Sequence, residues 1–151
     1  MNIRPCTVDE LIEDPRFADL AAGYEAECAT AGLGDCIVQT ATYKHLESTG
    51  LLRAVAAYAD GQLVGFVTVL TSMLPHFGKL VGTTESYYVA PDYRKGGLGA
   101  GLLQVAEAVA QDQGAVGFFV SAPAGGRLEK IMGRTAGYRH SNTVFFKGLG
   151  A

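Results

Sequence analysis

The sequence predicts an α/β fold in which helices cover both faces of a mixed, mostly antiparallel sheet, giving three layers. Two apolar runs, residues 52–58 and 63–70, meet at Asp60-Gly61, a dipeptide typical of tight hairpins, so we expect them to pair antiparallel. Farther along, a strand, a glycine-rich turn, a periodic helix and another apolar run follow in the order of a β-α-β unit. At 151 residues, 48% of them hydrophobic, the chain fits one domain (residues 1–151) with its own core.

Four elements are expected before the hairpin: a short strand between Ile3 and Cys6, a helix starting after Thr7, a second helix through residues 17–24 and a third near residues 40–48. Thr7 and Glu10 have the spacing of a capping box, which marks a helix start. Pro15 interrupts the first helix, because proline lacks the N–H that a helix interior needs. A glycine-containing loop at residues 31–35 precedes the third helix, which Gly50 closes.

After the hairpin, residues 71–80 form a loop or a strand extension. The expected elements beyond it are a strand at residues 82–89, a helix from Leu98 to about Gln113, a strand at residues 116–121, a short helix containing Leu128, Ile131 and Met132, and a last strand at Thr143 to Lys147. Gly114 stops the long helix, and residues 123–126 form a turn before the short one.

The strongest functional signal lies between the strand at residues 82–89 and the long helix. It reads Val89-Ala90-Pro91-Asp92-Tyr93-Arg94-Lys95-Gly96-Gly97-Leu98-Gly99-Ala100-Gly101. Glycines let several N–H groups converge, a helix N-terminus adds its positive dipole end, and two cations add full charges, so the segment predicts an anion site for a phosphate or pyrophosphate. A Walker loop is excluded, because no lysine follows a glycine in the required register. The dinucleotide fingerprint also fails, because its third glycine would fall on Leu102 or Gln104.

The remaining pattern, Val89-x-Pro91-x-x-Arg94-x-x-Gly97-x-Gly99, resembles motif A of the GNAT N-acetyltransferase superfamily. The resemblance is detailed from Gly61 to Tyr138, including the run of residues 61–66 and the pair Gly137-Tyr138, and follows the order of elements along nearly the whole chain. It implies a three-layer α/β/α GNAT-like fold in which the strand at residues 82–89 splays from the strand at 116–121. It also implies acetyl-CoA as cosubstrate, contacted by the main-chain groups of Tyr87, Tyr88 and Val89 and by Arg94, Lys95, Gly96, Gly97, Leu98, Gly99 and Ala100.

The implied reaction is direct transfer of the acetyl group, in a ternary complex, to a primary amine of a small cationic molecule or of a protein. Members of the family commonly pair, so a homodimer is compatible with the resemblance. Two alternatives stay open. The first is an acyl-CoA-binding module that has lost catalysis, because Gly126 and Gly133 stand where the family often has an asparagine and a tyrosine. The second is a nucleotide-binding Rossmann-type protein.

Glu85 is the expected acceptor of the amine's proton, since many family members carry an acid at this position and a carboxylate is unusual in such a strand. Strict alternation would place Glu85 on one face with Thr83, Tyr87 and Val89. For the departing thiolate, either no general acid is needed or a hydroxyl supplies the proton; the candidates are Ser121 and Tyr138. The expected acceptor-pocket residues are Tyr24, Tyr43, His45 and His76, although for His76 an exposed position in its loop is the favoured interpretation.

The net charge of −3 hides an asymmetry between the two parts of the chain. Residues 1–60 carry ten acidic and four basic residues, and residues 61–151 carry five acidic and eight basic ones. This split suits a cationic acceptor and an anionic cosubstrate. No basic block with interleaved aromatics, no apolar run of membrane-spanning length and no metal-ligand spacing of histidines appear, so we expect no nucleic acid, membrane or metal partner. Three cysteines without a C-x-x-C pair, and an N-terminus unlike a signal peptide, favour reduced thiols in the cytoplasm.

Overall fold

The computed structural model describes residues 1–150 and contains one five-stranded sheet in the order β1-β2-β3-β4-β5. The elements are β1 (Asn2–Cys6), α1 (Val8–Glu13), α2 (Phe17–Cys28), α3 (Thr40–Ser48), β2 (Leu52–Ala59), β3 (Gln62–Leu74), β4 (Lys79–Val89), a 3₁₀ turn (Pro91–Tyr93), α4 (Leu98–Asp112), β5 (Gly117–Phe119) and α5 (Arg127–Met132). The pairs β1–β2, β2–β3 and β3–β4 are antiparallel, and β4–β5 is parallel. The mixed, mostly antiparallel α/β prediction is therefore confirmed.

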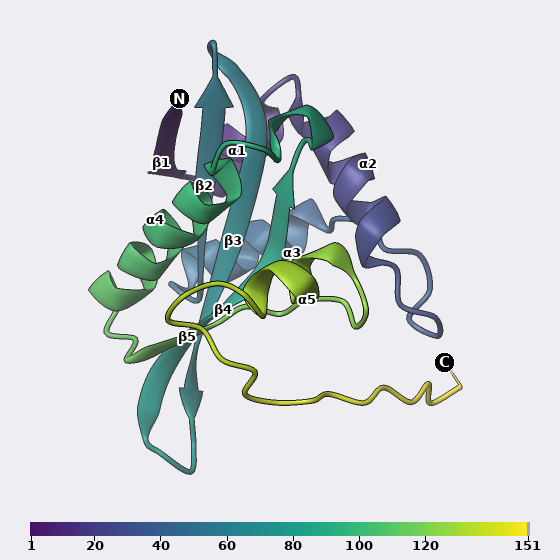
Figure 1. Ribbon diagram of the computed structural model, residues 1–151, viewed down its shortest axis with the longest axis vertical. Helices are drawn as coiled ribbons and strands as arrows, with labels where there is room; N and C mark the ends of the chain where they lie inside the picture. Colours follow the sequence, from purple (N-terminus) through teal and green to yellow (C-terminus); the bar gives the residue numbers. More distant parts are fainter. Residues whose placement is uncertain (151) are drawn as a thin grey trace.

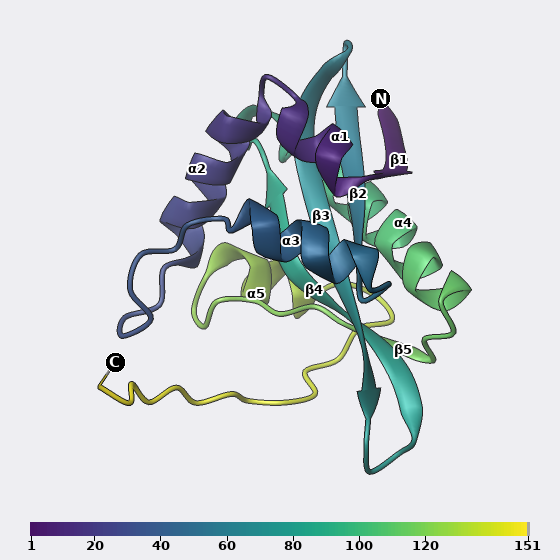
Figure 2. The same ribbon diagram turned by 180° about the vertical axis from the view of Figure 1, so that it is seen from behind.

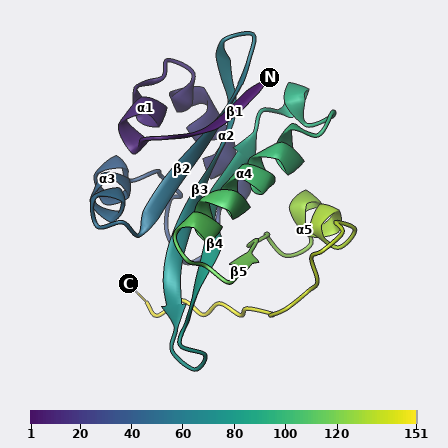
Figure 3. The same ribbon diagram turned by 90° about the vertical axis from the view of Figure 1, so that its left-hand side faces the viewer.

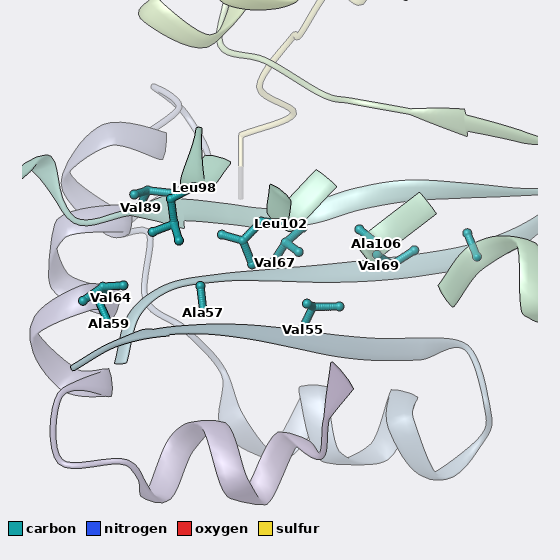
Figure 4. Packing of buried hydrophobic residues seen from close by; sticks show 11 residues of the cluster. Val55, Ala57, Ala59, Val64, Val67, Val69, Val89, Leu98, Leu102 and Ala106 are labelled. Atoms are coloured by element: carbon teal, nitrogen blue, oxygen red, sulfur yellow. The ribbon is translucent and has the colours of Figure 1, made fainter. Parts of the chain in front are cut away.

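Helices cover the two faces of the sheet unequally. On one face α4 packs on alternate apolar residues of β2 and β3, among them Val55, Val67 and Val69, through Leu98 and Leu102 (Figure 4). On the other face α1 and α2 pack on a second cluster that includes Phe17, Phe66 and Tyr88. Figure 3 shows the layers edge-on, with α4 and α5 on one side of the sheet and α1 and α3 on the other. We call these the α4 face and the α1–α3 face.

The local signals of the N-terminal half correspond to observed structure. Thr7 and Glu10 exchange both hydrogen bonds of a capping box at the start of α1. The chain breaks around Pro15 before α2 begins at Phe17. At the hairpin, Asp60 (φ +51°) and Gly61 (φ +75°) both adopt the left-handed conformation, as a two-residue turn of type I′ requires. Beyond Thr71, β3 and β4 continue as a projecting hairpin whose tip is residues 75–78, so this region is a strand extension (Figure 1).

The last two strands of the sheet, β4 and β5, separate, as the resemblance implied. We call the point where they part the splay. β4 pairs with β5 only at Val81–Gly117, Gly82–Phe118 and Thr83–Phe119, whereas β4 itself continues to Val89. Beyond β5, the Ser121 N–H donates to the Thr84 side chain. The edge of β4 over residues 85–89 is therefore left unpaired by β5.

Two elements at the C-terminal end differ from the prediction. The strand expected at residues 116–121 is shorter, Gly117–Phe119, because the chain turns away after the splay. The strand expected at Thr143 to Lys147 is wrong: these residues are extended but pair with no strand in residues 1–150. Strand propensity is present there, but no partner strand lies alongside.

The expectation of three reduced thiols is also wrong for two of them. Cys28, at the end of α2, and Cys36, in the loop that returns toward α3, form a disulfide, and Cys6 is free. The fold brings the pair together because the α2–α3 loop doubles back on the helix end. Among residues 1–150, no helix is long and apolar enough to cross a membrane.

Candidate active site

The glycine segment forms an open cradle at the start of α4. Gly96 (φ +107°) and Gly97 (φ +87°) adopt the left-handed conformation, and a Cβ added to either would meet no protein atom within 4 Å. Because the first N–H groups of a helix lack intrahelical acceptors, those of Leu98, Gly99 and Ala100 are free for a ligand. Their side chains play no part: Leu98 is buried against the sheet and Ala100 is exposed. The cradle fits an anion bound by backbone groups.

Gly99 is a glycine for a different reason. A Cβ at Gly99 would lie 2.7 Å from the Tyr87 hydroxyl oxygen, so the absence of a side chain is what lets β4 and the first turn of α4 approach. Burial raises the pKa of Tyr87 to about 12, and the nearby Arg127 partly opposes that shift. Tyr87 therefore lies beside the cradle as a neutral phenol.

Arg94 is held by groups on the protein itself. Its Nε donates to the Val89 carbonyl oxygen at 2.8 Å, and one terminal nitrogen is 2.6 Å from the Glu27 carboxylate on α2. The guanidinium carbon lies 5.2 Å from the centre of the Tyr88 ring, a cation–π arrangement. Arg94 thus ties the cradle loop to the end of β4 and to α2, whereas Lys95 is exposed beside it.

Tyr88 lies on the face of β4 opposite to Tyr87. Its ring packs against α2, where a Cβ added to Gly23 would lie 2.1 Å from the Tyr88 hydroxyl oxygen. Val89 points to the α4 face with Tyr87. Of the three β4 residues whose main-chain groups are expected to contact the cosubstrate, Tyr87 and Val89 place their side chains on the α4 face and Tyr88 on the other.

A β-bulge corrects the predicted orientation of Glu85. Ser86 pairs with Thr68 and Thr84 with Val69, so Glu85 is an extra residue in β4 without a partner on β3. The bulge breaks the alternation, and the Glu85 side chain lies on the α1–α3 face instead of sharing a face with Tyr87 and Val89. The prediction that these three share a face is wrong for this reason.

The Glu85 carboxylate is held from two directions. The Tyr43 hydroxyl, from α3, donates to Oε2 at 2.5 Å, and the Thr68 hydroxyl, from β3, donates to the same oxygen at 2.9 Å. The Tyr24 hydroxyl, from α2, donates to the Glu85 carbonyl oxygen at 3.2 Å. Among residues 1–150, the other carboxylate oxygen receives no hydrogen bond. The structure therefore fixes this acid while leaving one oxygen available.

Both tyrosines around Glu85 are poor acids. Burial, followed by the hydrogen bond to Glu85, raises the pKa of Tyr43 well above its ordinary value. Burial, followed by the Glu85 charge, raises the pKa of Tyr24 to about 12. Each hydroxyl keeps its proton near neutral pH and donates to Glu85, that of Tyr43 to the carboxylate and that of Tyr24 to the backbone carbonyl oxygen.

Two residues of this cluster, Thr68 and Ser86, were not among the candidates. Their hydroxyls lie 2.6 Å apart, both side chains are buried, and the Ser86 N–H donates to the Thr68 hydroxyl. Thr68 interrupts an apolar strand, Phe66-Val67-Thr68-Val69, and that interruption was the one available signal.

The two candidate general acids lie in different places. Ser121 is exposed just past β5, and its N–H bond to Thr84 holds it beside the splay. Tyr138 lies on the α4 side, where its hydroxyl donates to the Glu107 carboxylate. Burial, and then that hydrogen bond, raise the pKa of Tyr138 well above its ordinary value. Of these two candidates, only Ser121 has a hydroxyl that donates to no protein acceptor among residues 1–150.

The two histidines are not brought to the cluster. His45 is on α3 but exposed, and His76 is exposed at the tip of the β3–β4 hairpin, its ring 5.9 Å from that of Phe77. Six residues of extended β4 separate the start of that strand from Glu85, roughly 20 Å at the usual strand rise. Of the four predicted pocket residues, the structure unites Tyr24 and Tyr43 with Glu85. Among residues 1–150, His, Cys, Asp and Glu side chains form no group of three that fits a metal ion.

The arrangement therefore has two working sides that meet at the splay. A backbone anion cradle lies beyond the end of β4, and a fixed carboxylate lies on the α1–α3 face where β5 departs. The free edge of β4 over residues 85–89 joins them. Such a site can bind an anionic carrier and accept a proton from a second molecule.

Solved structures with the same fold include several acetyltransferases. A ribosomal-protein-alanine N-acetyltransferase from Brucella melitensis biovar Abortus 2308 matches with a TM-score of 0.67 and 22% identity, covering 97% of this chain and 100% of that one. An aminoglycoside acetyltransferase, meta-AAC0020 from an uncultured soil metagenomic sample, in complex with sisomicin, has a TM-score of 0.72 and 16% identity over 97% and 93%. Aminoglycoside N-acetyltransferase AAC(6')-Iy in complex with CoA gives 0.72 and 16% over 97% of both chains.

No curated protein matches the chain by sequence. The family model described as the acetyltransferase (GNAT) family matches residues 16–133, which include the cradle, the splay and the acid cluster. The chain belongs to the acetyltransferase (GNAT) family.

Proposed function

We propose that this enzyme transfers the acetyl group of acetyl-CoA to a primary amine, either on a small cationic molecule or on a protein. The observation that carries the proposal is Glu85: a bulge turns it to the α1–α3 face, and Tyr43 and Thr68 fix one of its oxygens at the start of the splay. The carboxylate thus lies where β4 parts from β5, on the opposite face from α4.

The cradle fits the pyrophosphate of acetyl-CoA. Gly96 and Gly97 leave the space above their backbone empty, and the α4 N-terminus offers free N–H groups to an anion. The free edge of β4 over residues 85–89 has the unpaired backbone groups that an extended amide-containing arm needs. When bound there, acetyl-CoA supplies an activated acyl group on a good leaving group.

In the proposed reaction a neutral amine attacks the thioester carbonyl carbon, a C–N bond forms and the C–S bond breaks. Glu85 accepts the proton that the amine loses, directly or through a water. The thiolate leaves as such or takes a proton from a hydroxyl. Ser121 is better placed for this than Tyr138, because the Tyr138 hydroxyl is already donated to Glu107.

A cationic acceptor is supported by the charges around Glu85. The hydroxyls of Tyr24 and Tyr43 add dipoles but no charge, so the carboxylate is the one ionic group that the cluster offers. The nearest cation on α3, Lys44, is 3.0 Å from Asp9. Among the structural neighbours, one acts on a ribosomal protein by its name and others on aminoglycosides; both types of acceptor contain amino groups.

A second candidate, an acyl-CoA-binding module without catalysis, rests on Gly126 and Gly133. They cap the two ends of α5 and bring no side chain to the site. Cytoplasmic location also stays a proposal, and its cysteine argument now depends on Cys6 alone, because Cys28 and Cys36 are joined.

The test combines thiol release across a panel of amines with calorimetric titration of coenzyme A, on wild type and Glu85→Gln. We expect Glu85→Gln to lower kcat by about 10²–10⁴-fold near neutral pH, the range of general acid–base catalysis. The loss should shrink at high pH, where more of the amine is already neutral, and coenzyme A affinity should not change. Glu13→Gln, an exposed acid on α1, is the matched control.

Coenzyme A binding without turnover of any amine would instead support the binding module. A deficit of Glu85→Gln that stays flat across pH, with a matching loss of stability, would contradict the role of Glu85 as proton acceptor.

A further inference from the structure

A disulfide closes the loop between α2 and α3 at its base. Cys28 ends α2, Cys36 lies where the loop returns toward α3, and the bond between them encloses residues 29–35. All of the enclosed residues are exposed, and among residues 1–150 their backbone hydrogen bonding is local, from the Leu33 N–H to the Thr30 carbonyl oxygen. Figure 2 shows the loop extending beyond the end of α2. The covalent bond therefore ties an otherwise weakly held loop to the helix.

Two glycines make this loop prone to disorder once the disulfide is open. Gly32 (φ +93°) and Gly34 (φ +79°) both adopt the left-handed conformation, and glycine gains more conformational entropy on release than any other residue. The tip lies against the C-terminal segment, where the Phe146 ring is beside Gly32. Past the disulfide, the Val38 N–H donates to the Glu25 carboxylate at 2.9 Å. After reduction, that hydrogen bond remains to hold the returning chain to α2.

The last turns of α2 contact both sides of the candidate site. The Tyr24 hydroxyl donates to the Glu85 carbonyl oxygen at 3.2 Å. The Glu27 carboxylate is 2.6 Å from Arg94, which holds the cradle loop. Cys28 follows Glu27 directly and lies about one helical turn beyond Tyr24. Because helix ends fray, a covalent bond at Cys28 stabilises the turn that carries both contacts.

The disulfide is accessible to a thiol. Cys28 and Cys36 are half-buried below a fully exposed loop, and disulfides within reach of solvent are the ones that exchange readily. The Glu25 carbonyl oxygen is 3.8 Å from the Cys28 sulfur, so the reduced thiol has an acceptor in place. Burial raises the pKa of Cys6, the free cysteine, to about 12, so its thiol is a poor nucleophile at neutral pH.

We propose that Cys28 and Cys36 form a reversible thiol–disulfide exchange site, and that a dithiol reductant opens it and so loosens the end of α2. One thiolate of the reductant attacks a sulfur of the disulfide, which forms a mixed disulfide and releases the other cysteine. The second thiolate of the reductant then attacks the reductant's own sulfur in the mixed disulfide, closes a ring and releases the second cysteine. Two electrons pass to the protein, and the two protons that the dithiol loses end on the cysteines. The oxidised state holds Tyr24 and Glu27 in place, and the reduced state releases them.

The first test needs neither an acceptor nor turnover. Peptide mass spectrometry of the full chain purified in air should find Cys28 joined to Cys36. Reduction with dithiothreitol should speed hydrogen exchange of the amides at the end of α2, residues 25–28, about tenfold, because the cross-link no longer opposes fraying. Cys28→Ser and Cys36→Ser should exchange at the fast rate with or without dithiothreitol, and Cys6→Ser, the matched control, should respond as wild type does. Two free thiols in the air-purified protein, or exchange unchanged by reduction, would overturn the proposal.

The second test measures the effect on the site, and its acceptor arm rests on the proposed acetyl transfer. Oxidised protein is compared with protein reduced and then freed of dithiothreitol under nitrogen, and turnover is followed by loss of the thioester absorbance. Reduction should raise the coenzyme A dissociation constant about threefold, through the weakened Glu27–Arg94 contact, and lower kcat/KM for the amine about three- to tenfold. Re-oxidation with glutathione disulfide should restore both values, and Cys36→Ser should keep the reduced ones.

The outcomes separate this inference from the proposed function. Equal coenzyme A affinity and equal turnover in the two states would overturn control of the site by the disulfide, even if the end of α2 exchanges faster. A threefold change in coenzyme A affinity with no turnover of any amine in either state would support the exchange site and contradict the proposed acetyl transfer.

Discussion

The α4 face and the α1–α3 face build their parts of the site in opposite ways. On the α4 face, the cradle is one continuous segment whose proposed ligand-binding groups are backbone N–H groups and whose glycines set the conformation. On the α1–α3 face, four elements each bring one group to Glu85: Tyr24 from α2, Tyr43 from α3, Thr68 from β3, and the bulge in β4. A cosubstrate shared by many enzymes suits the first design. An acceptor that must be discriminated suits the second, because side chains can change one at a time.

Because the cradle is built from backbone groups, its binding of coenzyme A should depend above all on backbone conformation. Gly97→Val should raise the dissociation constant of coenzyme A on the order of a hundredfold, because a left-handed residue with a Cβ is strained and its side chain fills the ligand space. Gly50→Val is a matched control, since Gly50 has φ +81° and equally open surroundings but lies far along the chain in the α3–β2 turn. Calorimetry that showed equal losses for both would mean that strain alone, and not the cradle, decides binding.

Arg94 shows where the two faces are joined, because it links the cradle loop to α2. If it acts by holding the loop, Arg94→Ala and Glu27→Gln should both weaken coenzyme A binding, by about tenfold and about threefold, the range of a charge-assisted hydrogen bond lost in part or in full. If the arginine instead contacts phosphate directly, as the motif predicts, freeing it from Glu27 should leave the affinity unchanged or raise it. Titration of both variants separates the two roles.

On the acceptor side the expected effects are smaller and fall on turnover. Tyr43→Phe removes one of two donors to the Glu85 carboxylate, so kcat should fall about three- to tenfold while the coenzyme A dissociation constant stays the same. Tyr58→Phe, which stacks on Arg4 at the opposite edge of the sheet, should change neither. A parallel loss of coenzyme A affinity in Tyr43→Phe would show that the two faces are not independent.

The contrast between one continuous segment and a cluster built from four elements also decides how much of each side the sequence predicts. Hairpin, capping box, helix order and cradle are local patterns, and the structure reproduces the elements they predict. Glu85 was singled out from its chemistry, but its face was predicted wrongly, because a bulge depends on the pairing of Thr68 with Ser86 and leaves no local mark. The Cys28–Cys36 disulfide and the unpaired C-terminal segment likewise depend on how distant elements meet.

The smallest expected effect is on stability at alkaline pH, and it can be compared between one tyrosine from each side. Tyr24 and Tyr87 both have a pKa raised to about 12 by burial, against about 10 in an unfolded chain. Between those values the unfolded chain loses the phenolic proton and the folded protein keeps it, so the free energy of unfolding is undiminished below about pH 10 and falls as the pH rises toward 12. Tyr24→Phe and Tyr87→Phe should each make this fall shallower, measured by urea unfolding across the range.

Bound coenzyme A should delay ionisation of Tyr87, which lies beside the cradle, while Tyr24 continues to titrate as before. Tyrosinate absorbance of the two variants with and without coenzyme A would show this, and equal protection of both tyrosines would contradict the separation of the two faces.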